Sequence, residues 1–407
     1  MIKYLLLILV ITNSYFGYSQ KVNIDLVKKH ISFLASDELN GRGTGTPDEK
    51  KAANYIASYF KEVGIKPLKN SYYKNFTFKT AKSSHDTSTA NSPLREGMNV
   101  VGYLDNKAPL TVVIGAHYDH LGTGLDHNSL EANPEGKIHN GADDNASGTA
   151  GVLELARYFS TNKSTEPFNF LFICFSGEEL GLIGSKRYLD NPDLALASFN
   201  YMINMDMIGR LNEENKLIVY GVGTSPVWVN LLDSIQSGLH IKKDSAGMGP
   251  SDHASFYLKE IPALAFFTGQ HSDYHKPGDD ISKINFKGEE EVLNVVIQVI
   301  EKTYNYPKMQ FLKTRNPDMG KKSFKVTMGV MPDYTFEGEG MRLDGVSDGK
   351  PAQKAGIQKG DIIIQIGEYP IKDVMAYMKV LGNFNKEDLV DVILIRDNKK
   401  QTVKVKL

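Results

Sequence analysis

The chain has 407 residues, of which 41% are hydrophobic and 23% are charged. At about 100 to 200 residues per domain, this length predicts two or three globular domains, and the composition excludes disordered, collagen-like and coiled-coil proteins. The 47 basic and 48 acidic side chains give a net charge of −1, so no positive excess favours nucleic acid. Cys174 is the only cysteine, which excludes an internal disulfide and zinc sites built from cysteine pairs. Any bound metal must therefore be held by histidines and carboxylates.

The first residues have the features of a secretory signal peptide. Lys3 precedes a short apolar stretch over residues 5–12, and the small residues Gly17 and Ser19 stand at the −3 and −1 positions of a cleavage site. We therefore predict a signal peptide over residues 1–19 and a mature protein that is secreted or periplasmic. No cysteine follows the cleavage site to carry a lipid anchor, and no apolar stretch reaches the ~18 residues that a membrane span needs.

Two amphipathic helices are predicted over residues 22–39 and 47–63, where apolar residues recur at a period near 3.6. The loop at residues 41–47 (GRGTGTP) follows a helix rather than a strand and lacks the third glycine of a dinucleotide loop, so we assign it no nucleotide-binding role. Residues 71–97 are rich in Ser, Thr, Asn and Lys, which predicts an exposed connection.

Apolar runs that alternate with helical patterns predict a doubly wound α/β domain. Several runs are apolar on both faces, which favours a largely parallel sheet with helices on both faces. The runs span residues 99–104, 110–116, 168–175, 201–205, 216–220 and 261–267. The composition changes after Pro307, so we predict an α/β domain over residues 20–307, a linker over 308–322 and a small β domain over 323–407.

Acidic and histidine side chains follow four of these runs, at the sheet edge where open α/β sheets bind ligands, and a further pair opens a helix. Each has an ordinary alternative when taken alone; Asp143 or Asp144, for example, could cap the helix. Their common position at one edge predicts a functional site. The candidates are His117, Asp119, His120, Asp143, Asp144, Glu178, Glu179, Asp206, Asp273 and His275.

Imidazole and carboxylate ligands without a thiolate suit Zn²⁺, with Mn²⁺ or Co²⁺ as substitutes. Three carboxylates against two divalent cations leave one positive charge, which a bridging hydroxide neutralises. Two metals about 3.5–4 Å apart can activate that water and polarise a carbonyl. The residue types therefore predict two metal ions and one free carboxylate that acts as the base.

The order and spacing of these motifs resemble the M28 family of co-catalytic zinc aminopeptidases over about residues 22–306. The motifs are HxD at 117–119, GADDNASG at 141–148, GEExG at 177–181, NMDM at 204–207 and YHxP at 274–277. The resemblance implies that His117 and Asp206 bind one zinc, that Glu179 and His275 bind the other, and that Asp144 bridges the two.

The resemblance also implies Glu178 as the general base and Asp119 as the residue that orients His117. The implied activity is hydrolysis of the first bond of peptides that have a free N-terminus.

The chain departs from the family in two places. Residues 71–97 leave no room for the protease-associated domain that many secreted relatives carry, and Met248 stands where some relatives have a tyrosine that stabilises the oxyanion. We expect that stabilisation from the metals or another donor. Asp252 and His253 either contact substrate or serve in packing.

The last domain resembles a bacterial PDZ domain in its segment PAQKAGIQKGDII at 351–363 and, more weakly, in MGV at 328–330. PDZ domains commonly bind a peptide C-terminus as an added strand. A peptide-binding module and a non-binding appendage are both open at this point.

The main prediction is therefore a secreted or periplasmic zinc aminopeptidase with a PDZ-like domain, which acts on peptide substrates. The alternative enzyme is a glutaminyl cyclase, which has the same sheet but resembles a one-zinc version of the site; the context of His117 and Asp144 favours two metals. A third alternative, an inactive peptide-binding protein on the same fold, is disfavoured because all five ligands and the base are present.

Overall fold

The computed structural model describes residues 21–79, 93–126, 128–162, 164–314, 326–332, 338–346, 349–372 and 374–407. The expected signal peptide and residues 315–322 of the expected linker lie outside this part of the chain. Among the residues described, no helix has the length and apolar character required to cross a bilayer.

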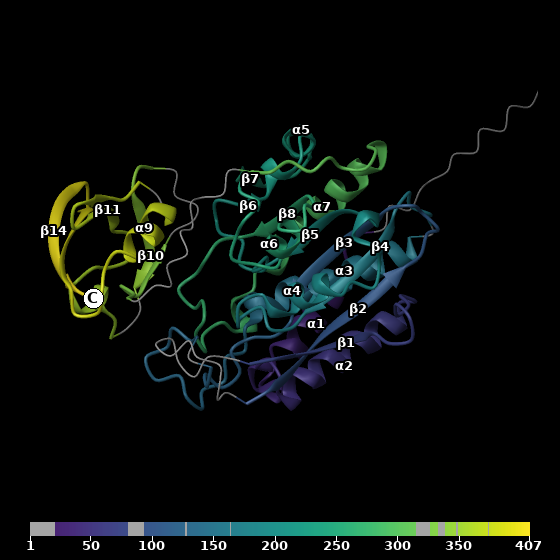
Figure 1. Ribbon diagram of the computed structural model, residues 1–407, viewed down its shortest axis with the longest axis horizontal. Helices are drawn as coiled ribbons and strands as arrows, with labels where there is room; N and C mark the ends of the chain where they lie inside the picture. The colour runs from purple at the N-terminus through teal and green to yellow at the C-terminus, as the bar shows by residue number, and fades with distance from the viewer. Residues whose placement is uncertain are drawn as a thin grey trace, which may run out of the picture.

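The first domain is built on an eight-stranded mixed sheet with the order β1-β2-β4-β3-β5-β8-β6-β7 (Figure 1). Its strands are β1 (Tyr73–Phe78), β2 (Arg95–Leu104), β3 (Thr111–His117), β4 (Asn169–Phe175), β5 (Phe199–Met205), β6 (Lys216–Tyr220), β7 (His240–Lys243) and β8 (Ala263–Phe267). The neighbouring strands β4, β3, β5 and β8 are parallel. The pairs β1–β2, β2–β4 and β6–β8 are antiparallel. The predicted α/β fold is confirmed, with the parallel strands in the middle of the sheet.

Helices cover both faces of this sheet, as predicted (Figure 1). One face packs against α1 (Ile24–Leu34), α2 (Pro47–Glu62), α3 (Gly148–Thr161), α5 (Trp228–Asp233) and α7 (Phe286–Lys302). The other packs against α4 (Ile183–Asp190) and α6 (His253–Tyr257). Every residue of β3, β4 and β5 is buried, which explains why these strands are apolar on both faces.

The prediction of an exposed connection over residues 71–97 is wrong for part of that segment. β1 pairs with β2 at the sheet edge, and β2 begins at Arg95. Along β1 exposed and partly buried residues alternate up to the buried Phe78, as expected of a strand covered on one face only. Its polar residues therefore conceal a strand from a search for apolar runs.

The start of the expected linker is held on the α/β domain. The Met309 N–H donates to Asn200 Oδ1 at 2.7 Å, and the Leu312 N–H donates to the Thr224 carbonyl at 2.8 Å. The Thr314 N–H donates to the Tyr257 hydroxyl at 3.0 Å. We therefore propose that the connection between the domains begins after Thr314 rather than after Pro307.

The second domain is an antiparallel sheet with the order β14-β13-β11-β10-β9, in which β12 pairs with β11. Its elements are β9 (Val330–Pro332), β10 (Met341–Val346), α8 (Pro351–Lys354), β11 (Ile362–Ile366), β12 (Tyr369–Pro370), α9 (Val374–Leu381), β13 (Leu389–Arg396) and β14 (Lys399–Lys406). It has a separate core that includes Met341, Ile363 and Val392. The predicted small β domain is confirmed.

Candidate metal centre

The candidate ligands come from the carboxyl ends of the four central strands. β3 ends at His117, and β4 and β5 end directly before the segments that carry Glu179 and Asp206. The segment after β8 carries His275, and the irregular turn before α3 carries Asp144. Because these strands are parallel and adjacent, their ends meet at one edge and bring residues that are far apart in sequence together.

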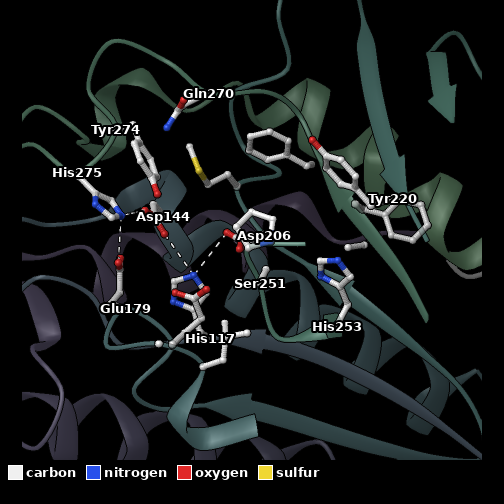
Figure 2. Close-up of a pocket in the computed structure, with 18 residues that line it drawn as sticks. His117, Asp144, Glu179, Asp206, Tyr220, Ser251, His253, Gln270, Tyr274 and His275 are labelled. Atoms are coloured by element: carbon white, nitrogen blue, oxygen red, sulfur yellow. Dashed lines mark ion pairs between the residues drawn. The ribbon is translucent and has the colours of Figure 1, made fainter. Parts of the chain in front are cut away.

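The five candidate ligands form one cluster (Figure 2). His117 Nε2 lies 3.3 Å from Asp144 Oδ1 and 3.5 Å from Asp206 Oδ1. His275 Nε2 lies 3.3 Å from Asp144 Oδ2 and 3.0 Å from Glu179 Oε2. The Asp144 carboxylate therefore presents one oxygen to each histidine. This is the position that a bridging ligand would take.

Glu178 lies on the same side of the cluster as Asp206. Donor atoms of His117, Glu178 and Asp206 lie within 4.8 Å of one another, as do those of His117, Asp144 and Glu179. Burial raises the pKa of Glu178 well above its usual value, and the negative charges of Glu179 and Asp206 raise it further. A carboxyl group in these surroundings is suited to accept and release a proton.

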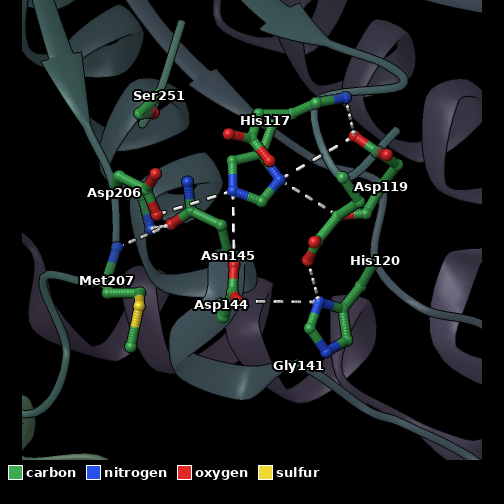
Figure 3. A network of polar contacts seen from close by, with 12 residues as sticks. His117, Asp119, His120, Gly141, Asp144, Asn145, Asp206, Met207 and Ser251 are labelled. Carbon is green, nitrogen blue, oxygen red and sulfur yellow. Dashed lines mark hydrogen bonds and ion pairs between the residues drawn. The ribbon is translucent and has the colours of Figure 1, made fainter. Parts of the chain in front are cut away.

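Asp119 is buried behind His117 and contacts it mainly through the backbone (Figure 3). His117 Nδ1 lies 3.1 Å from the Asp119 carbonyl oxygen and 3.8 Å from Asp119 Oδ1. The Asp119 carboxylate accepts hydrogen bonds from the Glu178 N–H at 3.2 Å and from the Thr44 hydroxyl at 2.7 Å. The residue thus touches both His117 and the loop of Glu178.

The donor set fits divalent metal ions. Four acidic side chains lie around two histidines in this cluster. The imidazoles carry no charge when they act as ligands, so they do not offset the negative charge of the carboxylates. The acidic side chains are Asp144, Glu178, Glu179 and Asp206. Such a group of anions is costly to hold together unless cations offset the repulsion. Histidine nitrogens and carboxylate oxygens are among the ligands that zinc binds in proteins.

Two of the ten candidates point away from the cluster. Asp143 Oδ1 accepts a hydrogen bond from the Gly209 N–H at 2.7 Å, and Asp143 Oδ2 lies 3.2 Å from His271 Nε2. Asp273 forms an ion pair with Lys283 at 2.7 Å. The helix-cap alternative for Asp143 or Asp144 is wrong, because the N-cap of α3 is Ser147.

His120 contacts Glu179 in the candidate centre, and the sequence alone does not predict this contact. It is buried, and its Nδ1 lies 2.7 Å from Glu179 Oε1, opposite the Glu179 oxygen that faces His275. The sequence signal for a role of His120 in the centre is its position three residues after His117. A partner of this kind fixes the direction of a carboxylate ligand.

A cavity of about 410 Å³ opens beside the cluster (Figure 2). Its polar rim is the candidate centre, and its other walls are largely apolar and aromatic. These walls include Leu182, Met207, Tyr220, Phe266 and Phe267. Such a pocket suits a small ligand with an apolar part and one polar end.

His253 lines this cavity, whereas Asp252 is fully buried and is not part of the lining. The His253 ring stacks on Tyr220 with 6.4 Å between centroids. Burial lowers the pKa of His253 to about 4 and raises that of Asp252 to about 7. Met248 is absent from the lining, in which Ser251, Tyr220 and Tyr274 carry hydroxyl groups.

Fold and site together define an α/β protein whose candidate metal centre lies at the carboxyl edge of its parallel strands. Residues 99–300 match the family model described as peptidase family M28, and residues 317–407 match that of the PDZ domain. The chain thus carries an M28 peptidase domain followed by a PDZ domain.

Among curated proteins, the chain is 32% identical over 200 residues to Aminopeptidase YwaD of Bacillus subtilis (strain 168), a match of 44% of this chain and 38% of the relative. The matches to the first curated relatives span only between 38% and 51% of those proteins' own length.

Two solved structures share the fold. BSAP, a zinc aminopeptidase from Bacillus subtilis, has a TM-score of 0.56 at 18% identity and covers 72% of this chain and 98% of its own. Porphyromonas gingivalis glutaminyl cyclase has a TM-score of 0.55 at 16% identity and covers 70% of this chain and all of its own (100%). At these identities the likeness concerns the fold.

Proposed function

We propose that this protein is a zinc-dependent aminopeptidase that binds two metal ions. The observation that carries the proposal is the Asp144 carboxylate, which lies 3.3 Å from each of two histidines that belong to separate segments. His117 and Asp206 would hold one ion, and Glu179 and His275 would hold the other.

Two such ions would lower the pKa of a bound water and polarise the scissile carbonyl. Glu178 accepts the proton of the attacking water and delivers it to the leaving amine. Asp119 fixes the loop of Glu178 through the Glu178 N–H and holds His117 through its carbonyl oxygen. Hydroxyl groups of the lining, such as that of Ser251, are candidates for the oxyanion donor that Met248 does not provide.

The pocket supports the choice of an N-terminal residue as substrate. Its polar rim can receive the N-terminal amine and the scissile carbonyl, and its apolar walls of Met207, Tyr220 and Phe267 accept a side chain. The test compares amino-acid amides and free peptides with the same peptides blocked by N-acetylation. We expect turnover of the free amines only. Equal turnover of blocked peptides would contradict an aminopeptidase.

Glutaminyl cyclase is the second candidate, because a solved enzyme of that activity shares the fold. The two activities differ in product, since a cyclase converts an N-terminal Gln without releasing an amino acid. Mass spectrometry of a Gln-initiated peptide separates them: loss of ammonia alone indicates the cyclase. Elemental analysis supplies the second criterion, with about two equivalents of metal expected for the peptidase.

We propose that the PDZ domain either binds peptides or is a non-binding appendage. In both cases we propose that the first domain alone hydrolyses small amides. A chain that ends after Thr314 tests this, because residues 309–314 contact the α/β domain. We expect kcat on amino-acid amides within about twofold of the full chain. A truncated chain that folds and binds metal but has no activity would place part of the active site in the PDZ domain.

We propose that residues 1–19 are a signal peptide that directs export of the protein and is then removed. Sequencing of the mature protein should find Gln20 at its N-terminus. A mature chain that retains Met1 would contradict this part of the proposal.

A further inference from the structure

The glycine-rich loop of residues 41–47, which has no role so far, lies against the candidate metal centre. Arg42 in this loop is 0% exposed. Its guanidinium donates four hydrogen bonds, all to backbone carbonyls: to Tyr118 at 2.7 Å, to Leu34 and Asn140 at 2.5 Å each, and to Gly141 at 3.0 Å. Tyr118 follows His117, and Gly141 precedes the turn that carries Asp144. One side chain therefore joins two segments that carry candidate ligands.

Close backbone contacts hold the loop against the same segments. The Gly122 N–H donates to the Gly41 carbonyl at 3.0 Å, and the His120 N–H donates to the Arg42 carbonyl at 3.3 Å. A Cβ at Gly41, where φ is +71°, would lie 2.4 Å from the His139 carbonyl oxygen. Only glycine fits there, so the loop is built to lie against the segment after β3.

Arg42 is also a buried charge without a direct ion pair. Across the described part of the chain, no carboxylate oxygen lies within 4.0 Å of its guanidinium, because carbonyls take its hydrogen bonds. Burial lowers its pKa to about 10, against the opposing effect of Asp119 and Asp144, so it is charged at neutral pH. Its charge acts at a distance on the carboxylates of the centre.

Thr44, from the same loop, acts on a different member of the cluster. Its hydroxyl donates to Asp119 Oδ2 at 2.7 Å, while Asp119 Oδ1 accepts from the Glu178 N–H at 3.2 Å. The Thr44 side chain thus fixes the carboxylate that stands behind His117.

We propose that Arg42 and Thr44 are positioning residues of the metal centre, which hold the ligand-bearing segments and the carboxylate of Asp119 in place. This inference rests on the proposed metal-dependent function. It assigns a role to the loop at residues 41–47 that neither a nucleotide-binding motif nor the ligand set provides.

The test measures the affinity of the metal-free protein for Zn²⁺ and Co²⁺ by competition with a chromogenic chelator, together with stoichiometry and thermal midpoint. The variants are Thr44→Val, Arg42→Met and Arg42→Lys. Thr46→Val is the matched control for Thr44, because its hydroxyl donates to the Gly43 carbonyl in the same loop. Arg157→Met is the control for Arg42, because Arg157 pairs with Glu154 on α3.

We expect Thr44→Val to weaken metal binding about 10-fold, the lower end of the usual effect of losing a partner behind a ligand, because Thr44 acts on His117 only through Asp119. Arg42→Met should weaken it further, because the ligand-bearing segments lose all four hydrogen bonds. Arg42→Lys should fall between Arg42→Met and the wild type, because the lysine ammonium can restore only part of this hydrogen bonding. The two controls should stay within about threefold of the wild type.

Folded Thr44→Val and Arg42→Met proteins that bind metal as tightly as their controls would overturn the inference. If Arg42→Met does not fold, the comparison of Thr44→Val with Thr46→Val decides alone. A wild-type protein that binds neither ion is a different outcome, which removes the proposed function itself.

Discussion

The two domains differ in how they offset buried negative charge. In the PDZ domain, the buried Asp361 carboxylate accepts hydrogen bonds from Arg396 at 2.7 and 2.6 Å, so the counter-charge comes from the chain itself. In the peptidase domain, Asp144 and Glu179 have side chains only 5% and 4% exposed, and their near neighbours are histidines. The buried carboxylate of the PDZ domain therefore has a counter-charge within the chain, whereas the carboxylate cluster of the peptidase domain would, on the proposed function, depend on cations from outside the chain.

The largest expected effect separates two adjacent carboxylates of the peptidase domain. Glu178→Gln keeps the size of the side chain but cannot accept a proton, so kcat should fall by about 10²- to 10⁴-fold with metal content unchanged. Glu179→Gln should instead lower metal content, because it removes the charge of a ligand. Steady-state kinetics and elemental analysis of both variants check this. Metal loss in Glu178→Gln, with only turnover lost in Glu179→Gln, would exchange the two roles.

Metal removal tests the dependence on external cations directly. At a free ion concentration of about 1,000 times Kd, each bound ion stabilises the folded state by about 4 kcal/mol. Chelation should therefore lower the unfolding midpoint of the peptidase domain by about 10 °C. The PDZ transition should not move. Differential scanning calorimetry resolves the two, and a shift of both transitions together would refute the comparison.

The internal ion pair of the PDZ domain provides the converse experiment. Asp361→Ala leaves Arg396 without its partner, which should destabilise this domain by an amount near the lower end of about 3–5 kcal/mol, since the Arg396 side chain is 22% exposed to water. Urea unfolding of the full chain measures the loss. Hydrolysis of small amides by the folded peptidase domain should be unchanged, and a parallel loss of metal affinity would show that the domains are not independent in this respect.

A smaller effect is expected from His30, a buried group that is kept neutral. It is 0% exposed, its Nδ1 lies 2.8 Å from the Tyr55 hydroxyl, and burial lowers its pKa to about 3. Because the unfolded chain binds a proton near pH 6.5 and the folded chain does not, stability is present above pH 6.5 and is lost as the pH falls toward 3.

The loss from His30 amounts to about 2 kcal/mol at pH 5. His30→Gln should reduce by that amount the difference in unfolding free energy between pH 7 and pH 5, measured by urea denaturation. His240→Gln is the control, because His240 is exposed. An equal change in both variants would assign the acid sensitivity to another group.

The strands that carry the candidate ligands could be predicted from sequence because burial on both faces leaves an unbroken apolar run. β3 and β4 are buried at every position, and each run stops where the polar edge begins. The candidate ligands could be placed for the same reason, since His117 is the last residue of β3 and Asp206 directly follows β5. Parallel pairing then places them together without any information on side-chain geometry.

The remaining contacts depend on distance in space that no local pattern encodes. Arg42 is one arginine among many until its acceptors, 8 to 99 residues away, are known. β1 was missed because an edge strand needs only one apolar face. The docking of Thr314 on Tyr257 was missed because a polar segment at the end of a domain has the composition of a linker whether or not it is bound.

The strand order has a practical consequence for engineering. The strands that carry candidate ligands, β4, β3, β5 and β8, are consecutive in the sheet, whereas β1 and β7 are its outermost members. A reporter domain inserted into the connection between Phe78 and Arg95 would be attached to the ends of β1 and β2, which lie outside that group of four strands. The protein can thus be labelled or immobilised through this connection while the strands that carry candidate ligands keep all of their mutual pairings.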